Sequence, residues 1–453
     1  MRRYRAHMTQ TAIQLAADVR SGRSTARAAT EEALARIEKT DPQIGAFQEV
    51  RIFAALREAD AVDARADRES LPLAGVPLPI KDNVPVAGEP MRSGSRGSES
   101  TPQRHDHEVV RRLRAAGAVI VGLTRVPELC VFGATDSAFG VTRNPWDPTR
   151  TPGGSSGGAA AAVAAGMVAV AHGNDGMGSI RIPAACCGLV GIKPGLGVVP
   201  ADLGARSWFD MAENGPLATT VEDCALVLSV LAARTELATI GDPGTIRVAV
   251  STKVPMLATP LDRHWAAAAR ETGVLLREAG RSVRDADPPY GQRLLASELV
   301  RWTAGTELDA RLLADRSRLE PRIRRHAALG RAALRAGLPR PAGRARWQRV
   351  AEAFFAGHDV LITPMLAQSP IASTAWSRRG WLANIWSNSH YAPFAAPWNV
   401  AGWPAMAVPA GLHPNGAPLS VQLVARPGGE ALLLAVAALL ERLRPWPRTA
   451  PRD

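Results

Sequence analysis

The first part of the chain has a helical pattern of apolar and polar positions. Apolar residues recur every three or four positions in successive stretches, which predicts amphipathic helices at 11–21, 25–39 and 51–65. A further helix is predicted at 106–116, with Asp106 as its N-cap, and the apolar run 118–122 follows it as a buried strand. A helix followed directly by a buried strand is typical of α/β proteins.

The remaining pattern alternates between short apolar runs and longer periodic segments. A helix of small residues is predicted at 157–166, and a buried strand at 167–171 leads into a glycine-rich turn at 174–179. Further strands are predicted at 246–250, 360–363 and 420–425, and a closing helix at 430–442. The alternation predicts an α/β fold in a single large domain, with helices around a central mixed, mostly parallel β-sheet.

The composition is that of a globular protein, because 46% of the 453 residues are hydrophobic and 21% are charged. The longest uncharged apolar run, 159–171, is too short to cross a bilayer. The basic N-terminus has no apolar segment behind it that could form a secretory signal. We therefore expect a cytoplasmic protein without membrane association, with its start at Met1 or Met8.

The formal charge of +12 is concentrated in residues 301–350, which contain thirteen arginines and four acidic residues. The pattern there predicts amphipathic helices with arginine on the outer face, forming an insertion or cap. Aromatic residues do not alternate with the basic ones, and no nucleic-acid-binding motif is present. We therefore expect no nucleic-acid partner.

The cysteines and histidines predict neither a metal site nor a cofactor. The four cysteines have no metal-ligand spacing, and the adjacent Cys186 and Cys187 cannot easily pair with each other. Buried free thiols are therefore expected. The nine histidines are scattered, with His105 and His107 as the only close pair.

Lysine is rare in this chain, with four lysines against fifty arginines, so a lysine in a loop is informative. Lys81 follows the proline-interrupted apolar stretch 73–80 and precedes Asp82. Burial lowers the pKa of a lysine towards the range in which the amine acts as a base. A salt bridge with Asp82 would instead make the residue structural, and the residues alone leave both roles open.

Two glycine-rich segments downstream of Lys81 contain serines. The loop 153–158 has four glycines around two serines and runs directly into an apolar helix, which favours a packed turn over a flexible linker. Its Gly-x-Ser-x-Gly spacing also fits the nucleophile elbow of an α/β-hydrolase. The second segment ends at Ser179, and its glycines allow several backbone N–H groups to converge as in an oxyanion hole. One lysine and two serines can transfer an acyl group without histidine.

The order of these three motifs resembles the amidase signature family. Other segments resembling the family are Asn-Pro-Trp-Asp at 144–147 and the stretches 188–194, 215–223, 399–405 and 418–424. The resemblance covers roughly 10–235 and 355–442. It implies a single amidase domain at 1–453 with a signature core at 66–235, and it leaves 301–350 as an arginine-rich helical insertion or cap.

The resemblance also implies a role for each motif residue. Lys81 would be the base, Ser155 the proton relay after a cis peptide bond, and Ser179 the nucleophile that forms an acyl-enzyme. The oxyanion hole of the family falls on the backbone N–H groups of Gly176, Met177, Gly178 and Ser179. The implied activity is hydrolysis of a carboxamide C–N bond to a carboxylate and ammonia or an amine.

Two supporting residues and two departures follow from the same resemblance. Ser156 would donate a supporting hydrogen bond, and Arg181 would order the nucleophile loop through a carboxylate. The family usually has glycine at the position of Met177 and threonine or serine at that of Asn174. We expect the side chain of Met177 to narrow the acyl pocket.

The expected partner is a small-molecule amide, and a homodimer is one assembly that the sequence allows. The region 376–403 holds five tryptophans with Tyr391 and Phe394, which either line the acyl pocket or form ordinary core.

Three alternative functions compete with a stand-alone amidase. One is the catalytic subunit of a tRNA-dependent amidotransferase. Another is a Ser–His–Asp hydrolase that uses Ser155 with His390 or His413. The last is a catalytically inactive amide-binding relative, against which the intact triad argues.

Overall fold

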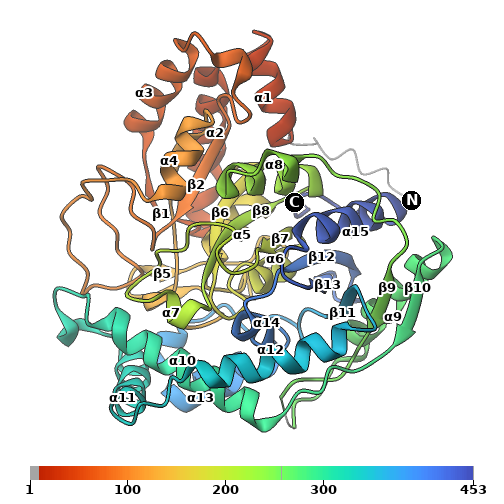
Figure 1. The fold of residues 1–453 in the computed structure, drawn as a ribbon. Helices are drawn as coiled ribbons and strands as arrows, with labels where there is room; N and C mark the ends of the chain where they lie inside the picture. Colours follow the sequence, from red (N-terminus) through yellow and green to blue (C-terminus); the bar gives the residue numbers. More distant parts are fainter. Residues whose placement is uncertain (1–9, 257, 452–453) are drawn as a thin grey trace.

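The computed structural model describes residues 10–256 and 258–451, and Met8 lies outside these residues. The chain forms a single α/β domain around a large mixed sheet flanked by helices, which confirms the predicted fold class (Figure 1). The strands are β1 (Phe47–Val50), β2 (Pro77–Lys81), β3 (Val119–Thr124), β4 (Asp136–Ser137), β5 (Gly140–Val141), β6 (Val170–Asp175), β7 (Val190–Lys193), β8 (Glu213–Ala218), β9 (Arg247–Val250), β10 (Ser282–Asp285), β11 (Val360–Pro364), β12 (Ala405–Leu412) and β13 (Pro418–Ala425).

The α-helices include the predicted amphipathic segments and the closing helix. They are α1 (Ala12–Arg20), α2 (Ala26–Ile44), α3 (Ile52–Asp63), α4 (Glu108–Ala115), α5 (Gly157–Ala164), α6 (Arg181–Cys187), α7 (Ser207–Asp210), α8 (Val221–Ala232), α9 (Arg263–Glu278), α10 (Gln292–Ala310), α11 (Pro321–Arg335), α12 (Pro341–Phe355), α13 (Trp381–Tyr391), α14 (Ala396–Ala401) and α15 (Glu430–Leu443).

The eight-stranded sheet has the order β10-β9-β11-β13-β12-β7-β8-β6. Only the pairs β10–β9 and β9–β11 are parallel, and the other pairs are antiparallel. The prediction of a mostly parallel sheet is therefore wrong. One reason for the antiparallel pairing is local: β12 and β13 form a hairpin, and such a tight connection reverses the chain direction.

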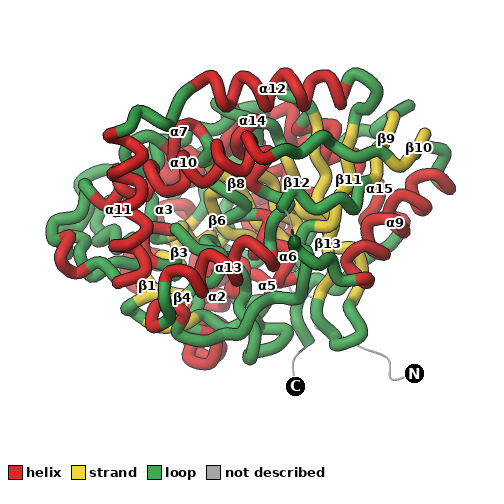
Figure 2. The backbone as a smooth tube through the Cα atoms, turned by 90° about the horizontal axis from the view of Figure 1, so that it is seen from below, coloured by secondary structure: helices red, strands yellow, loops and turns green. Residues whose placement is uncertain are grey.

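Both faces of the central part of this sheet are buried, which explains the apolar runs of β11 and β13, whereas the edge strand β10 is mostly exposed. Alternate residues of a strand point to opposite faces. Val248 and Ile362 belong to a core that includes residues of α8, α9 and α15, whereas Ala249 and Leu361 belong to a second core with residues of α10, α12 and α14. In Figure 2 strands of the large sheet accordingly lie between α12 and α14 on one side and α9 on the other.

A separate three-stranded sheet, in the order β1-β3-β2, belongs to the N-terminal part of the chain. It lies with α1 to α4 at the top of the view in Figure 1. Strand β2 packs against β6, the end strand of the large sheet, although the two strands share no ladder. The backbone N–H of Lys81 in β2 donates to Nδ1 of His172 in β6 across this junction (3.4 Å). The ends of β2 and β6 are thereby held side by side.

The predicted N-cap of α4 is wrong. His107 caps the helix, because its Nδ1 accepts from the N–H of Val109 (3.2 Å). The carboxylate of Asp106 instead accepts from the N–H of Ala87 (2.8 Å) and pairs with Arg114 (2.9 Å). A partly buried carboxylate is better stabilised by an arginine than by one helix terminus.

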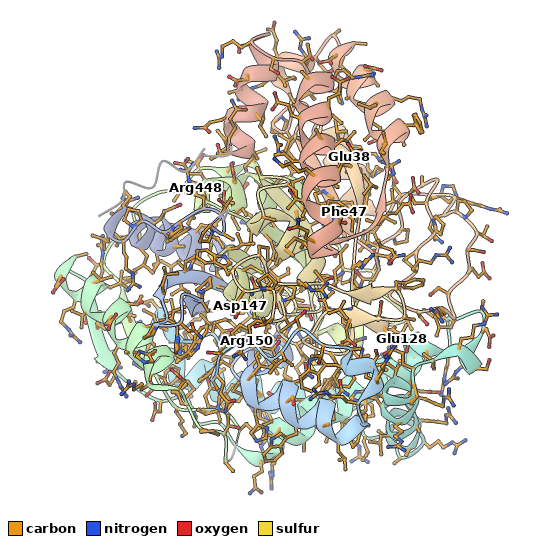
Figure 3. The ribbon with its side chains drawn as sticks, turned by 180° about the vertical axis from the view of Figure 1, so that it is seen from behind. Glu38, Phe47, Glu128, Asp147, Arg150 and Arg448 are labelled. Carbon is orange, nitrogen blue, oxygen red and sulfur yellow. The ribbon has the colours of Figure 1, made fainter. Side chains whose placement is uncertain are left out.

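Residues 301–350 comprise most of α10, all of α11 and most of α12, at the bottom of the view in Figure 1. The prediction that their arginines face outward fails for Arg322, which is buried and pairs with Glu320 (2.8 Å) and Asp136 (3.1 Å). Two carboxylates offset the cost of burying this guanidinium. Glu128, labelled in Figure 3, accepts from the N–H of Glu320 (2.7 Å) and so ties the loop after β3 to the start of α11.

None of the helices in the described ranges is both long enough and apolar enough to span a bilayer.

Candidate active site

The side chain of Lys81 is fully buried at the end of strand β2. Its Nζ lies 2.8 Å from Ser155 Oγ, 2.7 Å from Asn174 Oδ1 and 3.1 Å from the Asn174 carbonyl oxygen. No carboxylate accepts from Nζ in the described part of the chain. Asp82, the alternative partner, accepts instead from the N–H of Arg92 (2.9 Å).

Burial lowers the pKa of Lys81 to about 8, although the charges of Cys130 and Asp175 act in the opposite direction. The ammonium form is disfavoured because the charge is removed from water and its three acceptors are uncharged oxygens. At mildly alkaline pH the amine is therefore largely neutral, and its lone pair can accept a proton from Ser155.

The loop before α5 places two serines against Lys81 and β6. The peptide bond Gly154–Ser155 is cis, as the resemblance implied. A Cβ at Gly154 would lie 2.8 Å from the backbone of Phe132, so this position requires glycine. Ser156 donates to the carbonyl oxygen of Asn174 (3.2 Å), the same oxygen that accepts from Lys81. The resemblance implied that Ser156 donates a hydrogen bond, and the structure gives this carbonyl oxygen as the acceptor.

Ser179 lies in the turn that connects β6 to α6, and the backbone at Gly178 has a positive φ of 112°. The carbonyl oxygen of Ser179 accepts from the N–H of Ser156 (3.1 Å), which ties this turn to the Gly/Ser loop. Asp175 in turn accepts from the N–H of Gly178 at 2.6 Å. The nucleophile turn is thus fixed from both sides.

The N–H of Gly178 is therefore already engaged, which corrects the four-donor oxyanion hole predicted from the sequence. The N–H groups of Met177 and Ser179 have no other acceptor among residues 10–256 and 258–451. With the N–H of Gly176 they are the remaining donors for a developing oxyanion.

Arg181 orders the turn through a carboxylate, as predicted. It pairs with Asp175 through Nε (2.8 Å) and Nη2 (2.9 Å), and both side chains are completely buried. Burial alone would raise the pKa of Asp175, but the charge and hydrogen bonds of Arg181 hold it well below its usual range. Arg181 also donates to Asn399 (2.5 Å) and Gln422 (2.6 Å), which belong to the C-terminal part of the chain.

Two clefts meet at Ser179 and Trp208. The polar cleft, with about 340 Å³ of empty volume, is lined by Asn83, Cys130, Ser155, Asn174, Gly176, Ser179, Trp208 and their neighbours. The apolar cleft, with about 630 Å³ of empty volume that includes some open solvent, is lined by Phe132, Met177, Ser179, Ile182, Trp208, Glu298, Trp302 and their neighbours. An amide carbon at Ser179 would therefore have one cleft for each of its substituents.

Comparison with known proteins identifies the family to which this chain belongs. The sequence model of the family described as Amidase matches residues 28–434. AmiB2 from Mycobacterium tuberculosis, a protein assigned as an amidase, is 42% identical over 449 residues and covers 95% of each chain. The chain belongs to the amidase signature family. Like its relatives, it is an amide-hydrolysing enzyme.

Two further relatives bear on the activity of this amidase. The solved structure of 6-aminohexanoate cyclic dimer hydrolase complexed with substrate has a TM-score of 0.86 and 30% identity, covering 97% of this chain and 98% of that one. A glutamyl-tRNA(Gln) amidotransferase subunit of Chloroflexus aurantiacus is 34% identical over 485 residues and covers 98% of both chains.

The histidine-based alternative finds no support in the geometry of the amidase. His390 is bonded to the carbonyl oxygen of Trp386 (2.8 Å), and His413 lies 3.6 Å from Asp262. No histidine of the described residues lines either cleft. The described residues also contain no group of three or more metal-binding side chains.

None of the five tryptophans of the region 376–403 lines the apolar cleft. The two tryptophans that line the apolar cleft are Trp208 and Trp302, which lie outside 376–403. Trp398 and Trp403 are buried in the second core of the sheet, and Trp386 is exposed. Met177 lines the apolar cleft.

Two residues at the site are not predicted as functional by the sequence. Asn174 stands out there only as a departure from the family, yet its side-chain oxygen accepts from Lys81. The feature of the sequence that could have pointed to Asn174 is its position directly before Asp175, at the start of the predicted turn. Cys130 is a buried free thiol that lines the polar cleft with Ser155, and its sequence surroundings carry no motif.

Proposed function

We propose that this amidase cleaves carboxamides through an acyl-enzyme on Ser179, with Lys81 as the base and Ser155 as the proton relay. The observation that carries the proposal is the 2.8 Å contact between Lys81 Nζ and Ser155 Oγ, because Ser155 also lines the polar cleft together with Ser179. A buried lysine with a lowered pKa at this contact is suited to general-base catalysis.

In the first half of the reaction, neutral Lys81 accepts the proton of Ser155 as Ser155 accepts that of Ser179. The Ser179 oxygen bonds to the amide carbon, and the N–H groups of Met177 and Ser179 stabilise the oxyanion. Ser155 then passes a proton to the leaving nitrogen, the C–N bond breaks, and an amine or ammonia departs. Water attacks the ester by the same proton path, which releases the carboxylate and restores Ser179.

The test is release of ammonia or amine from aliphatic, aryl-acyl and anilide amides by the wild type, Ser179→Ala and Lys81→Ala. Each substitution removes either the nucleophile or its base, so we expect the kcat of both variants to be at least about 10³-fold lower than that of the wild type. The exposed lysine in Lys39→Ala serves as a matched control that should retain full activity.

A fluorophosphonate should label Ser179 in the wild type and fail to label Ser179→Ala. Turnover that survives in Ser179→Ala would refute the assignment of the nucleophile. Silence of the wild type on every amide, without labelling, would favour an inactive relative.

A second candidate function is the catalytic component of a glutamyl-tRNA(Gln) amidotransferase, favoured by the 34% identity to one subunit of such an enzyme. A component of this kind would work in an assembly, whereas a stand-alone hydrolase turns over simple amides by itself. Labelling of Ser179 without turnover of any simple amide by the isolated chain would favour the amidotransferase.

A further inference from the structure

The apolar cleft is on the acyl side of Ser179, and this assignment rests on the proposed function. Ser155 must reach the leaving nitrogen to protonate it, so the leaving group occupies the cleft that contains Ser155. That cleft is the polar one, and Ser155 does not line the apolar cleft. The acyl chain of the substrate therefore extends into the apolar cleft, past Met177 and towards α10.

The wall of the apolar cleft contains one carboxyl group that has no partner. Glu298, in α10, is 7% exposed, and its Oε1 has no hydrogen-bond partner within the described ranges. The other side chains that line the cleft are aliphatic, aromatic or uncharged polar groups. A buried carboxyl group without a partner is costly, so its presence in a cleft wall calls for an explanation, and a ligand that enters the cleft is one.

The surroundings of Glu298 supply no compensating positive charge. Burial alone raises its pKa to about 8, and no other group contributes to this shift. The neighbouring Tyr290 and Asp287 are a phenol and a carboxylate, and the charges of Glu298 and Asp287 add to the burial that raises the pKa of Tyr290. Arg301, one turn along α10, donates instead to Ser297 and to the carbonyl oxygen of Arg340.

The polar neighbours of Glu298 in the cleft do not supply the missing partner either. The side chain of Asn388 accepts from the N–H of Gly133 (2.7 Å) and donates to the carbonyl oxygen of Asn384 (2.8 Å). The indole N–H of Trp302 donates to the carbonyl oxygen of Val131 (3.0 Å). Among the described residues that line this cleft, Glu298 is therefore the one ionisable side chain, and it has no partner. A carboxylate binds hydrogen-bond donors best when they are cationic.

We infer that Glu298 is a specificity-determining residue that selects acyl groups ending in a primary amine, bound as the ammonium. The hydrocarbon part of such a chain lies against the apolar wall, and its ammonium forms a charge-assisted hydrogen bond with the ionised carboxylate. Binding of the ammonium makes Glu298 release its proton to solvent, so the pair forms as ammonium and carboxylate. The substrate class is thus amides of ω-amino carboxylic acids.

The experiment compares two series of anilides that differ only at the chain end, with acyl chains of four to seven atoms. One series ends in an amino group and the other in a methyl group. We expect the wild type to have a higher kcat/KM for the amino series at the chain length that reaches Glu298. Glu298→Gln should lower this amino-to-methyl ratio roughly 10- to 100-fold, because a hydrogen bond to a charged group is lost.

Control variants separate specificity from folding. Glu278→Gln removes an exposed carboxylate from α9 and should leave the ratio unchanged. Glu298→Met keeps an unbranched side chain of similar size but removes the carboxyl group. Its kcat/KM should fall for the amino series and stay the same or rise for the methyl series. A wild type that prefers the methyl series, or an unchanged ratio in Glu298→Gln, would overturn the inference.

The pH dependence of the ratio gives a readout that a structural role would not move. The ratio cancels the ionisation of Lys81, which affects both series equally. In the wild type the amino-to-methyl ratio should rise as the pH passes through about 8, because Glu298 ionises there. In Glu298→Gln the ratio should no longer change with pH in this range. A ratio that does not change with pH in the wild type would contradict the role of the carboxyl group.

Binding to Ser179→Ala protein, measured by calorimetry, tests the inference without turnover. Tighter binding of the amino amide, weakened by the added change Glu298→Gln, would support the inference even if the proposed function failed. Equal binding of both series would overturn it even if the hydrolysis of methyl-ended amides depends on Ser179.

Discussion

Raising the pH from 7 to 9 should increase kcat/KM of the wild-type amidase about tenfold. The reactive form of Lys81 is the neutral amine, and burial lowers the pKa of this lysine to about 8. With that pKa, about one-eleventh of the enzyme carries the neutral amine at pH 7 and about ten-elevenths at pH 9. The rate should therefore climb as the pH rises through about 8 and then level off.

The assay is the initial rate of anilide hydrolysis from pH 6 to 9.5 with a methyl-ended acyl chain, so that Glu298 does not contribute to substrate recognition. Asn174→Leu removes the side-chain acceptor 2.7 Å from Nζ, which disfavours the ammonium and should move the midpoint to lower pH. The neighbouring carboxyl group of Asp82, whose pKa burial raises to about 7, is the competing origin of such a profile.

Asp82→Asn is the matched control for this competing group. If Lys81 sets the profile, Asp82→Asn should keep the midpoint near pH 8 while Asn174→Leu shifts it. A wild-type rate that is flat between pH 7 and 9, or a midpoint that follows Asp82 and not Asn174, would refute the reasoning.

Three further substitutions test the surroundings of the site. Asp175→Asn leaves the buried Arg181 without its charge partner, and we expect it to lower the free energy of unfolding by about 3–5 kcal/mol in urea titration and to reduce labelling of Ser179; unchanged stability would show that the ion pair contributes little. Met177→Ala removes a side chain from the apolar cleft, so the ratio of kcat/KM for branched over linear acyl amides should rise, and a fall would contradict its position there. Gly158→Ala would place a Cβ 2.5 Å from a carbonyl oxygen and should lower stability by about 1–3 kcal/mol, whereas Gly241→Ala, with open space around it, should not.

The helices are more predictable from the sequence than the sheet. The amphipathic periodicity of α1 to α3 and α15 is a local property. The predicted segments therefore match these helices to within two residues at every end except the end of α2, which continues to Ile44. Strand β6 begins three residues later than predicted, because the apolar run 167–171 does not reveal where a fully buried strand begins. Its polar end, with Asn174 and Asp175, belongs to the strand although it has the composition of a turn.

The catalytic motifs are recognisable because each needs particular residue types in a fixed chain order. The sequence could not show that Asp175 engages the N–H of Gly178, since that contact depends on the geometry of the turn. Glu298 carries no motif, and its position in the wall depends on how α10 packs over the site. Long-range packing of this kind has no periodic signal, which is also why the sequence leaves the tryptophan-rich region open between pocket wall and core.

The contacts of Arg181 with Asn399 and Gln422 have a consequence for synthesis of the enzyme. Ser179 leaves the ribosome more than two hundred residues before Gln422, and domains generally fold as units during synthesis. A nascent chain that ends before α14 contains Asp175 but lacks Asn399 and Gln422, the two C-terminal side chains that also bind this arginine. Hydrolytic activity should therefore appear only late in translation, after the C-terminal part of the chain has joined the fold.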